Sequence, residues 1–200
     1  ICSKGRERPM FKIAVLVSGG GSNLQSIIEK SKSGELACEV ACVIGDRECY
    51  GVERAAEQGI VSCILDRKVF KKELCKEIDR VVSEKGVDLI VLAGFLSIID
   101  EEFVEKWKGK IINIHPSLLP KFGGPGMYGI KVHEAVLAAG EKESGCTVHY
   151  VDSGVDSGEV IFQVKVPVLE GDTAEVLQKR ILVEEHKLLP KSISKIISER

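Results

Sequence analysis

Residues 11–25, FKIAVLVSGGGSNLQ, decide the fold class of this chain. The run from Lys12 to Val17 is short and almost wholly apolar, which is typical of a buried strand in a parallel sheet. Three glycines and a Ser-Asn pair follow it directly, and a helical pattern begins after Asn23. A strand, a tight turn and a helix in this order predict the first part of a right-handed βαβ unit.

The same alternation continues through the first half of the chain. Further strands are predicted at 40–44, 61–65, 89–93 and 110–114, with helices across 52–58 and 71–85 and from Asp100. Gly34, Gly59 and Gly86 are placed to end the first three helices. The pattern predicts an α/β fold in which one open, mostly parallel sheet carries helices on both faces.

The second half is less regular. We predict a glycine-rich loop at 122–129, a short helix at 132–139, strands at 146–151 and 160–168 around a turn, and a long helix from Thr173. Pro190 is expected to kink or restart that helix. Its apolar stripe suits burial in the core or a dimer seam equally, so the sequence leaves monomer and homodimer open. The stripe consists of Val176, Leu177, Ile181, Leu188, Ile193 and Ile197.

Composition narrows the class of protein. Two hundred residues, 44% of them hydrophobic and 29% charged, suit one domain, which we place at 10–200. The net charge is −2 with both signs mixed, so nucleic acid is not expected as a partner. No apolar run reaches the ~20 residues of a membrane span, and no secretory signal is evident, so we expect no membrane partner and a cytoplasmic protein. Residues 1–9 are polar and without pattern, and we expect them to be disordered or extraneous, with a natural start at Met10.

Cysteine and histidine spacing does not favour a metal. The seven cysteines are an odd number without a Cys-x-x-Cys pair, which argues against a disulfide framework and structural zinc. His133, His149 and His186 do not have the spacing of metal ligands, so we predict no metal site.

The glycines after the first strand predict an anion site. Glycine permits positive φ and lets an oxygen approach the main chain, and the helix that follows points its N–H groups at the same place. A dinucleotide fingerprint would need glycine where Leu24 stands, and a P-loop would need Gly-Lys-Ser/Thr, which is missing. The motif therefore favours a phosphate over NAD or ATP, and a tight turn without any ligand remains the alternative.

Asn113 and His115 form the second candidate site. Residues two apart on a strand face the same way, and the carboxyl edge of an open α/β sheet is where ligands bind. An amide N–H and an imidazole could stabilise an oxyanion, and the imidazole could also move a proton. The alternative is a polar pair that merely ends the strand. Asp152 and Asp156, taken alone, are ordinary turn residues.

Several motifs, taken together and in order, carry a resemblance to a known family. They are SGGGSNLQ at 18–25, LAGF at 92–95, NIHPSLLP at 113–120, TVHYV at 147–151 with DSG at 156–158, and Glu185-His186. From about Met10 to near the C-terminus the chain resembles the glycinamide ribonucleotide formyltransferases of purine biosynthesis. The resemblance implies a Rossmann-like formyltransferase fold.

The resemblance also implies an activity. Members transfer a formyl group from 10-formyltetrahydrofolate to the amine of glycinamide ribonucleotide, in de novo synthesis of IMP. The folate is a co-substrate, and no tightly bound cofactor is implied. The substrate amine is itself the nucleophile, which would explain why no activated serine or cysteine is needed.

By position, the resemblance assigns roles to individual residues. Asn113 matches the oxyanion-stabilising amide, His115 the proton donor, and Asp156 the carboxylate that supports the histidine; such a carboxylate would favour the imidazolium. Gly21, Ser22 and Asn23 match the segment that holds the ribonucleotide phosphate, and Glu185 matches a carboxylate that contacts the ribose. The positions that match the folate-binding site are Arg67, Leu96, Ser97, Ile98, Ile99 and Asn113.

Two departures from the family pattern affect the donor side. Many relatives carry arginine where this chain has Ser97. The loop at 121–129 is longer than in better-known members, and its glycines would permit it to act as a mobile lid or simply as a surface excursion.

Two other classes of function remain open. One is another enzyme that uses formyltetrahydrofolate, such as a hydrolase or the transferase that formylates methionyl-tRNA. Those relatives are usually longer, and no basic tRNA-binding domain or preceding regulatory domain is expected here. The other is a non-catalytic phosphate-binding module, which would leave the grouping of Asn113, His115 and Asp156 unexplained.

Overall fold

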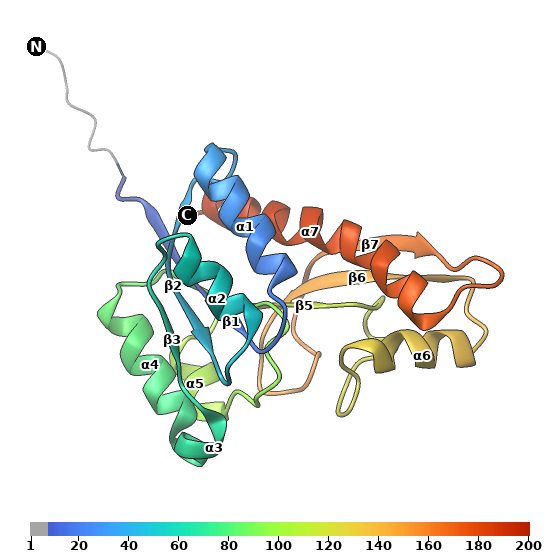
Figure 1. The fold of residues 1–200 in the computed structure, drawn as a ribbon, viewed down its shortest axis with the longest axis horizontal. Helices are drawn as coiled ribbons and strands as arrows, with labels where there is room; N and C mark the ends of the chain where they lie inside the picture. Colours follow the sequence, from blue (N-terminus) through green and yellow to red (C-terminus); the bar gives the residue numbers. More distant parts are fainter. Residues whose placement is uncertain (1–7) are drawn as a thin grey trace, which may run out of the picture.

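The computed structural model describes residues 8–200 (Figure 1). Of the segment 1–9, which we expected to be disordered or extraneous, residues 1–7 lie outside the described range. Arg8 lies next to the other end of the chain, where its guanidinium donates to the carbonyl of Arg200 (2.9 Å).

A single seven-stranded sheet forms the centre of the molecule. Its spatial order is β3-β2-β1-β4-β5-β6-β7; the first five strands are parallel, and β6 and β7 are antiparallel to their neighbours. The mostly parallel sheet is therefore confirmed. The strands are β1 (Phe11–Val17), β2 (Cys38–Gly45), β3 (Ser62–Ile64), β4 (Leu89–Leu92), β5 (Ile111–His115), β6 (Glu143–Tyr150) and β7 (Val160–Pro167).

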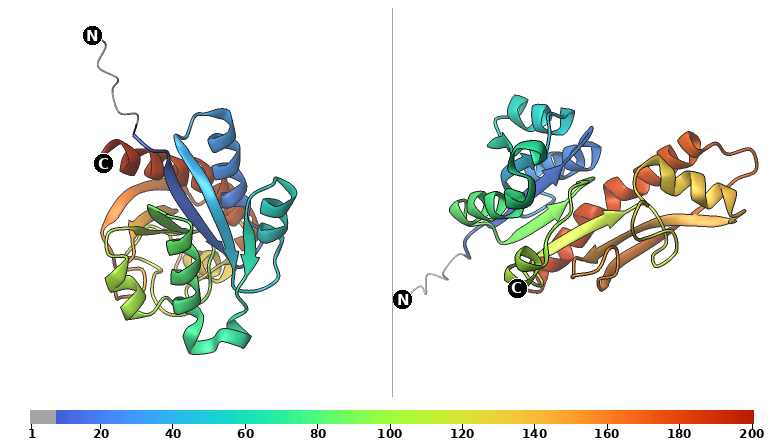
Figure 2. Two further views of the ribbon diagram at one scale, coloured as in Figure 1. Left: turned by 90° about the vertical axis from the view of Figure 1, so that its left-hand side faces the viewer. Right: turned by 90° about the horizontal axis from the view of Figure 1, so that it is seen from below.

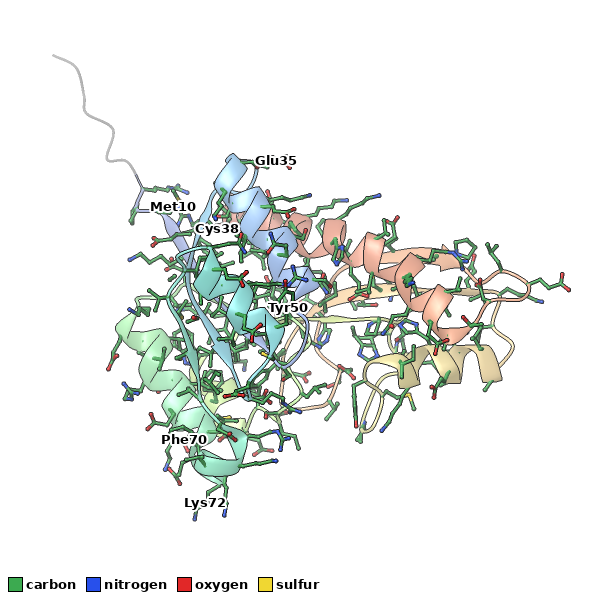
Figure 3. All side chains as sticks on the ribbon, viewed as in Figure 1. Met10, Glu35, Cys38, Tyr50, Phe70 and Lys72 are labelled. Atoms are coloured by element: carbon green, nitrogen blue, oxygen red, sulfur yellow. The ribbon has the colours of Figure 1, made fainter. Side chains whose placement is uncertain are left out.

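Helices cover both faces, as predicted (Figure 2). Alternate residues of β1 point to opposite sides: Ile13 and Val15 join the core under α1, α2 and α7, and Ala14 and Leu16 join the core under α4 and α5. Charged side chains such as those of Glu35 and Lys72 project at the periphery (Figure 3). The helices are α1 (Ser22–Ser33), α2 (Tyr50–Glu57), α3 (Arg67–Phe70), α4 (Leu74–Glu84), α5 (Glu101–Lys106), α6 (Ile130–Ala138) and α7 (Ala174–Ser198).

The helix predicted across 71–85 has an irregular start. It begins with a 3₁₀ turn at Lys71–Glu73 and is preceded by the short helix α3, which the sequence did not predict. Lys71 has φ 50°, a conformation uncommon outside glycine, so the chain changes direction between the two helices.

Of the kink or restart predicted at Pro190, the restart is wrong, because α7 runs without interruption from Ala174 to Ser198. Proline cannot donate to the carbonyl four residues earlier, that of His186. The hydroxyl of Ser26 on α1 donates to this carbonyl instead (2.5 Å). A partner from a neighbouring helix thus replaces the missing hydrogen bond.

The apolar stripe of α7 packs into the core. Leu177, Ile181, Leu188 and Ile193 are buried against the sheet, and Ile197 packs at its margin. Val176 was predicted to face the core, but it lies in the first turn of α7 and is 47% exposed. Of the two uses that the sequence left open for the stripe, core burial is the observed one.

Candidate active site

The loop between β1 and α1 presents backbone groups to its surroundings. Gly21 has φ 74°, and a Cβ built on it would lie 2.6 Å from the Cα of Gly51, so only glycine fits. Helix α2 holds the loop from outside: Gly51 N–H donates to the carbonyl of Gly19 (2.9 Å), and Arg54 Nε donates to that of Gly20 (2.7 Å). Within residues 8–200 no side chain caps the start of α1, which leaves its first N–H groups for an anion.

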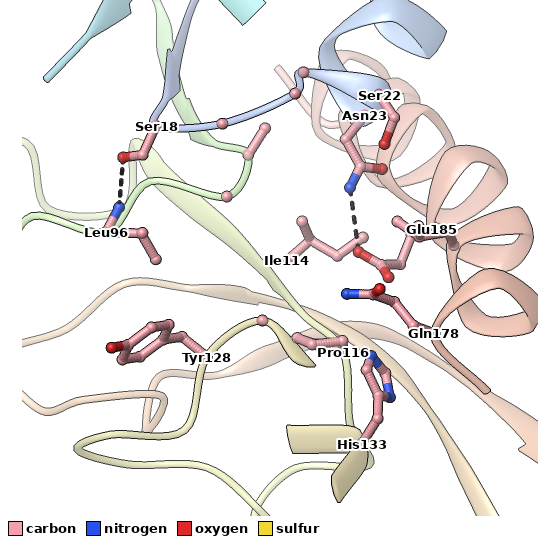
Figure 4. Close-up of a pocket in the computed structure, with 17 residues that line it drawn as sticks. Ser18, Ser22, Asn23, Leu96, Ile114, Pro116, Tyr128, His133, Gln178 and Glu185 are labelled. Carbon is pink, nitrogen blue, oxygen red and sulfur yellow. Dashed lines mark hydrogen bonds between the residues drawn. The ribbon is translucent and has the colours of Figure 1, made fainter. Parts of the chain in front are cut away.

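A cavity of about 420 Å³ opens beside this loop (Figure 4). Asn23 at the start of α1 and Glu185 on α7 meet in its wall, where Asn23 Nδ2 donates to Glu185 Oε1 (3.2 Å). Burial raises the pKa of Glu185 to about 7, and its side chain is held among the cavity walls. The structure thus brings the predicted phosphate residues Gly21, Ser22 and Asn23 together with the predicted ribose carboxylate.

Asn113 is oriented by a residue that the sequence did not assign, His149. The two lie opposite each other on β5 and β6, and Asn113 Nδ2 is 3.2 Å from His149 Nε2. Burial lowers the pKa of His149, so the neutral ring carries one proton. Because His149 Nδ1 faces the Tyr150 carbonyl (2.9 Å), that proton belongs on Nδ1 and Nε2 accepts. Asn113 must therefore turn an N–H toward His149, which leaves its second N–H for an oxyanion.

His115 lies between a backbone carbonyl and a carboxylate. Its Nε2 is 2.8 Å from the Phe122 carbonyl, and its Nδ1 is 3.6 Å from Asp156 Oδ2. Asp156 also lies 3.8 Å from His149 Nε2 and accepts a hydrogen bond from Gly124 N–H (3.1 Å). When His115 is protonated, both of its N–H groups therefore have an oxygen to face.

The backbone around this cluster is strained. Phe122 has φ 55° and Asp156 has φ 54°, both in the left-handed region that non-glycine residues rarely adopt. Such strain is concentrated at active sites, where the surrounding structure holds it in place. Here it sets the position of the Phe122 carbonyl and of the Asp156 carboxylate on either side of His115.

A second hollow, of about 690 Å³, adjoins the first, because Leu96 and Tyr128 line both. Ile99, which was expected in the donor site, packs instead against the core of α4 and α5. The predicted donor-site residues that do line the hollow are Arg67, Leu96, Ser97 and Ile98.

The second hollow is positively charged. Four cationic side chains line it against one carboxylate, that of Asp100; the four are Arg47, Arg67, Lys71 and Lys72. Arg47 is held in place by the fully buried Asp46, to which Ser97 Oγ also donates (2.5 Å). Although burial alone would raise the pKa of Asp46, the hydrogen bonds from Arg47 and Ser97 hold it below its usual value. The carboxylate therefore stays charged and fixes the guanidinium beside the hollow.

The end of β5 connects these parts. Ile114 and Pro116, on either side of His115, line the first cavity, and His115 itself lies just behind that wall. The anion loop, the buried carboxylate of Glu185 and the Asn-His-Asp cluster thus surround one edge of the sheet. Over residues 11–193 the chain matches a family described as formyl transferase. The chain belongs to this family.

Individual relatives of this formyl transferase chain are similar over nearly its whole length. The chloroplastic phosphoribosylglycinamide formyltransferase of Vigna unguiculata is 43% identical over 192 residues, which are 94% of this chain and 62% of that protein. The trifunctional purine biosynthetic protein adenosine-3 of Drosophila pseudoobscura is also 43% identical, over 96% of this chain and 14% of that protein. The chain therefore spans less than two thirds of these curated relatives.

Solved structures cover the fold more fully. The glycinamide ribonucleotide transformylase 1 of Symbiobacterium toebii has a TM-score of 0.91 and 38% identity, over 99% of this chain and 94% of that one. The phosphoribosylglycinamide formyltransferase of Anaplasma phagocytophilum has a TM-score of 0.87 and 41% identity, over 96% and 88%. The expected formyltransferase fold is confirmed. Among residues 8–200, no helix is both long and apolar enough to cross a membrane.

Sequence reasoning missed two polar groups of this formyl transferase site. The sequence predicts a strand around His149 but no role for it, because its position opposite Asn113 depends on the register between β5 and β6. The Asp46–Arg47 pair is not predicted from the sequence, in which its one sign is an acidic residue directly after an apolar strand.

Proposed function

We propose that the chain transfers a formyl group from 10-formyltetrahydrofolate to the amine of glycinamide ribonucleotide, in the synthesis of IMP. The observation that carries the proposal is the cluster of Asn113, His115 and Asp156 at the end of β5, the strand end whose residues Ile114 and Pro116 line the first cavity. The names of the relatives and of the solved structures support the same substrates. The folate is consumed as a co-substrate, and no tightly bound cofactor is required.

The two hollows suit the two substrates. A ribonucleotide presents a phosphate and sugar hydroxyl groups. The loop at 18–23 could bind the phosphate through its N–H groups, and Glu185 could accept hydrogen bonds from the hydroxyl groups. A folate ends in carboxylates, which the arginines and lysines of the second hollow would attract. With the phosphate at one end, the amine of the ribonucleotide would extend toward the shared wall at Leu96 and Tyr128.

The proposed chemistry begins with the amine nitrogen attacking the formyl carbon, whose carbonyl oxygen becomes an oxyanion. The free N–H of Asn113 and the imidazolium of His115 stabilise that charge, and to reach it the Nε2–H of His115 leaves the carbonyl of Phe122. The intermediate then collapses as the bond from carbon to N10 of the folate breaks. His115 gives its proton to N10, and the proton lost by the amine restores the imidazolium, so the reaction consumes no other reactant. Asp156 balances the positive charge of His115 at 3.6 Å.

A direct assay tests the proposal. The purified chain is mixed with a stable 10-formyl folate analogue, with and without glycinamide ribonucleotide, and release of deformylated folate is followed by absorbance. We expect release only when the ribonucleotide is present, together with one formylated ribonucleotide per folate in mass spectra. Release without the ribonucleotide would mean a hydrolase. Phosphate binding without folate binding would mean a non-catalytic module, and either result would overturn the proposal.

We also propose that the chain acts as a monomer. The apolar stripe of α7, the candidate dimer seam, is used in the core at Leu177, Ile181, Leu188 and Ile193. Sedimentation at micromolar concentration should give the mass of one chain, and a stable dimer would contradict this.

A further inference from the structure

His133 is a buried side chain in the first cavity to which the proposed reaction gives no role. It lies in the first turn of α6, is 1% exposed, and lines the cavity together with Gln178 and Glu185 (Figure 4). Its Nδ1 is buried, and within residues 8–200 it has no hydrogen-bond partner. No other described residue is hydrogen-bonded to Nε2 either, and because the side chain lines the cavity, a ligand there is an available partner for that nitrogen.

The position of its proton follows from the surroundings of the ring. Burial, assisted by the nearby His115, lowers the pKa of His133 to about 4, so at neutral pH the ring is uncharged and carries one N–H. A proton on Nδ1 would find no acceptor. The other ring nitrogen, Nε2, belongs to a side chain that lines the cavity. The proton therefore belongs on Nε2, and His133 offers a hydrogen-bond donor to whatever fills the cavity.

The groups around His133 favour an uncharged ligand atom. Figure 4 shows the anion loop and His133 on different sides of the cavity, with Gln178 and Glu185 on α7 between them. The uncapped N–H groups at the start of α1 are the anion-binding end of the cavity, so the phosphate belongs on the loop. Glu185 Oε1 is taken by Asn23, while the residues described provide no partner for Oε2. A donor at His133 and a free acceptor at Glu185 suit adjacent hydroxyl groups, which both donate and accept.

We propose that His133 is a substrate-binding residue whose Nε2–H donates to a ribose hydroxyl oxygen, while Glu185 accepts from the neighbouring hydroxyl. This inference rests on the proposed function, since it takes the ribonucleotide as the ligand of the cavity. The hydrogen bond from His133 would be a second contact to the sugar, in addition to that of Glu185. It would make the site selective for ribose over a sugar that lacks one hydroxyl.

The test is steady-state kinetics with glycinamide ribonucleotide and its 2′-deoxy and 3′-deoxy forms. His133→Leu should raise KM for the ribonucleotide about tenfold, the value of one hydrogen bond, with kcat and the KM of the folate nearly unchanged. His133→Gln, whose amide can reach the place of Nε2, should retain most of the affinity. His186→Leu is the matched control: His186 lies on α7 next to Glu185 and, like His133, has a ring nitrogen without a partner among residues 8–200, but it does not line the cavity.

The deoxy substrates make the test specific. One of them should bind more weakly than the ribonucleotide to the wild-type chain, and that penalty should disappear in His133→Leu. An unchanged KM in His133→Leu, or the same penalty in both proteins, would overturn the inference. Should His133→Leu fail to fold, the comparison of His133→Gln with His133→Asn tests the inference instead. The shorter Asn side chain cannot reach the place of Nε2, so equal affinities of these two variants for the ribonucleotide would overturn the inference.

The failure of this inference is distinguishable from failure of the proposed function. If the wild-type chain transfers no formyl group, calorimetric binding of ribose 5-phosphate replaces turnover as the readout. His133→Leu should then bind ribose 5-phosphate about tenfold more weakly than the wild-type chain. Equal binding by the two would overturn the inference.

Discussion

Replacing Glu185 with glutamine should stabilise the folded chain at neutral and alkaline pH. The carboxyl group is buried in the wall of the first cavity, with one hydrogen bond from Asn23 as its compensation. Glutamine keeps the shape and an oxygen that can accept from Asn23, but it carries no charge that burial would disfavour. Residues that bind substrate commonly destabilise the folded protein. Replacing such a residue therefore raises stability and weakens substrate binding.

The size and pH range of the effect follow from the pKa of Glu185, which burial raises from 4.5 to about 7. Below pH 4.5 the carboxyl group is protonated in both the folded and the unfolded chain, so it does not change the free energy of unfolding. Between these values the unfolded chain has released a proton that the folded chain still holds, so the free energy of unfolding falls as pH rises. Above pH 7 the loss is complete and amounts to about 3 kcal/mol as an upper value. Glu185→Gln removes this loss.

Urea unfolding of both proteins across the range from about pH 4.5 to 8 measures the effect. The variant should match the wild type at the acid end and exceed its stability by up to about 3 kcal/mol at the alkaline end, while it binds the ribonucleotide more weakly. Glu184→Gln is the matched control, because Glu184 neighbours Glu185 but lies at the surface beside Lys187 (3.6 Å). A difference between Glu185→Gln and wild type that does not change with pH would refute the reasoning.

Three further predictions concern the cluster and its supports. His115→Ala should lower kcat by about 10²–10⁴ with the KM of the ribonucleotide nearly unchanged, and near-normal turnover would remove the catalytic assignment. His149→Leu should lower kcat by roughly tenfold or more, up to the 10²–10³ of a lost oxyanion donor, because Asn113 is no longer oriented; a change confined to KM would argue against this role. Ser26→Ala should destabilise the chain by about 1–3 kcal/mol in urea unfolding, since the His186 carbonyl loses its donor, whereas unchanged stability would mean that the helix tolerates the gap.

Much of the fold could be predicted because its signals are local. The apolar run at β1 and the glycines after it specify a strand and a turn through the preferences of neighbouring residues alone. The position of Asn113 and His115 on one side of β5 follows from the two-residue period of a strand. Pro190 shows the limit of such reasoning: the local rule allows the helix to restart there, but α7 continues, and a hydroxyl on α1 satisfies the carbonyl that proline leaves unpaired.

The site itself depends on contacts between distant parts of the chain. Asn23 meets Glu185 across 162 residues, and Asn113 meets His149 only because β6 pairs with β5 in one register; a shift by one residue would turn the histidine to the other face. The sequence by itself determined the succession of the strands and of the helices other than α3 along the chain, the glycine loop after β1 and the strand that carries Asn113 and His115. Only the tertiary structure decided which side chains complete the site, because strand register and helix docking are set by packing among residues far apart in sequence.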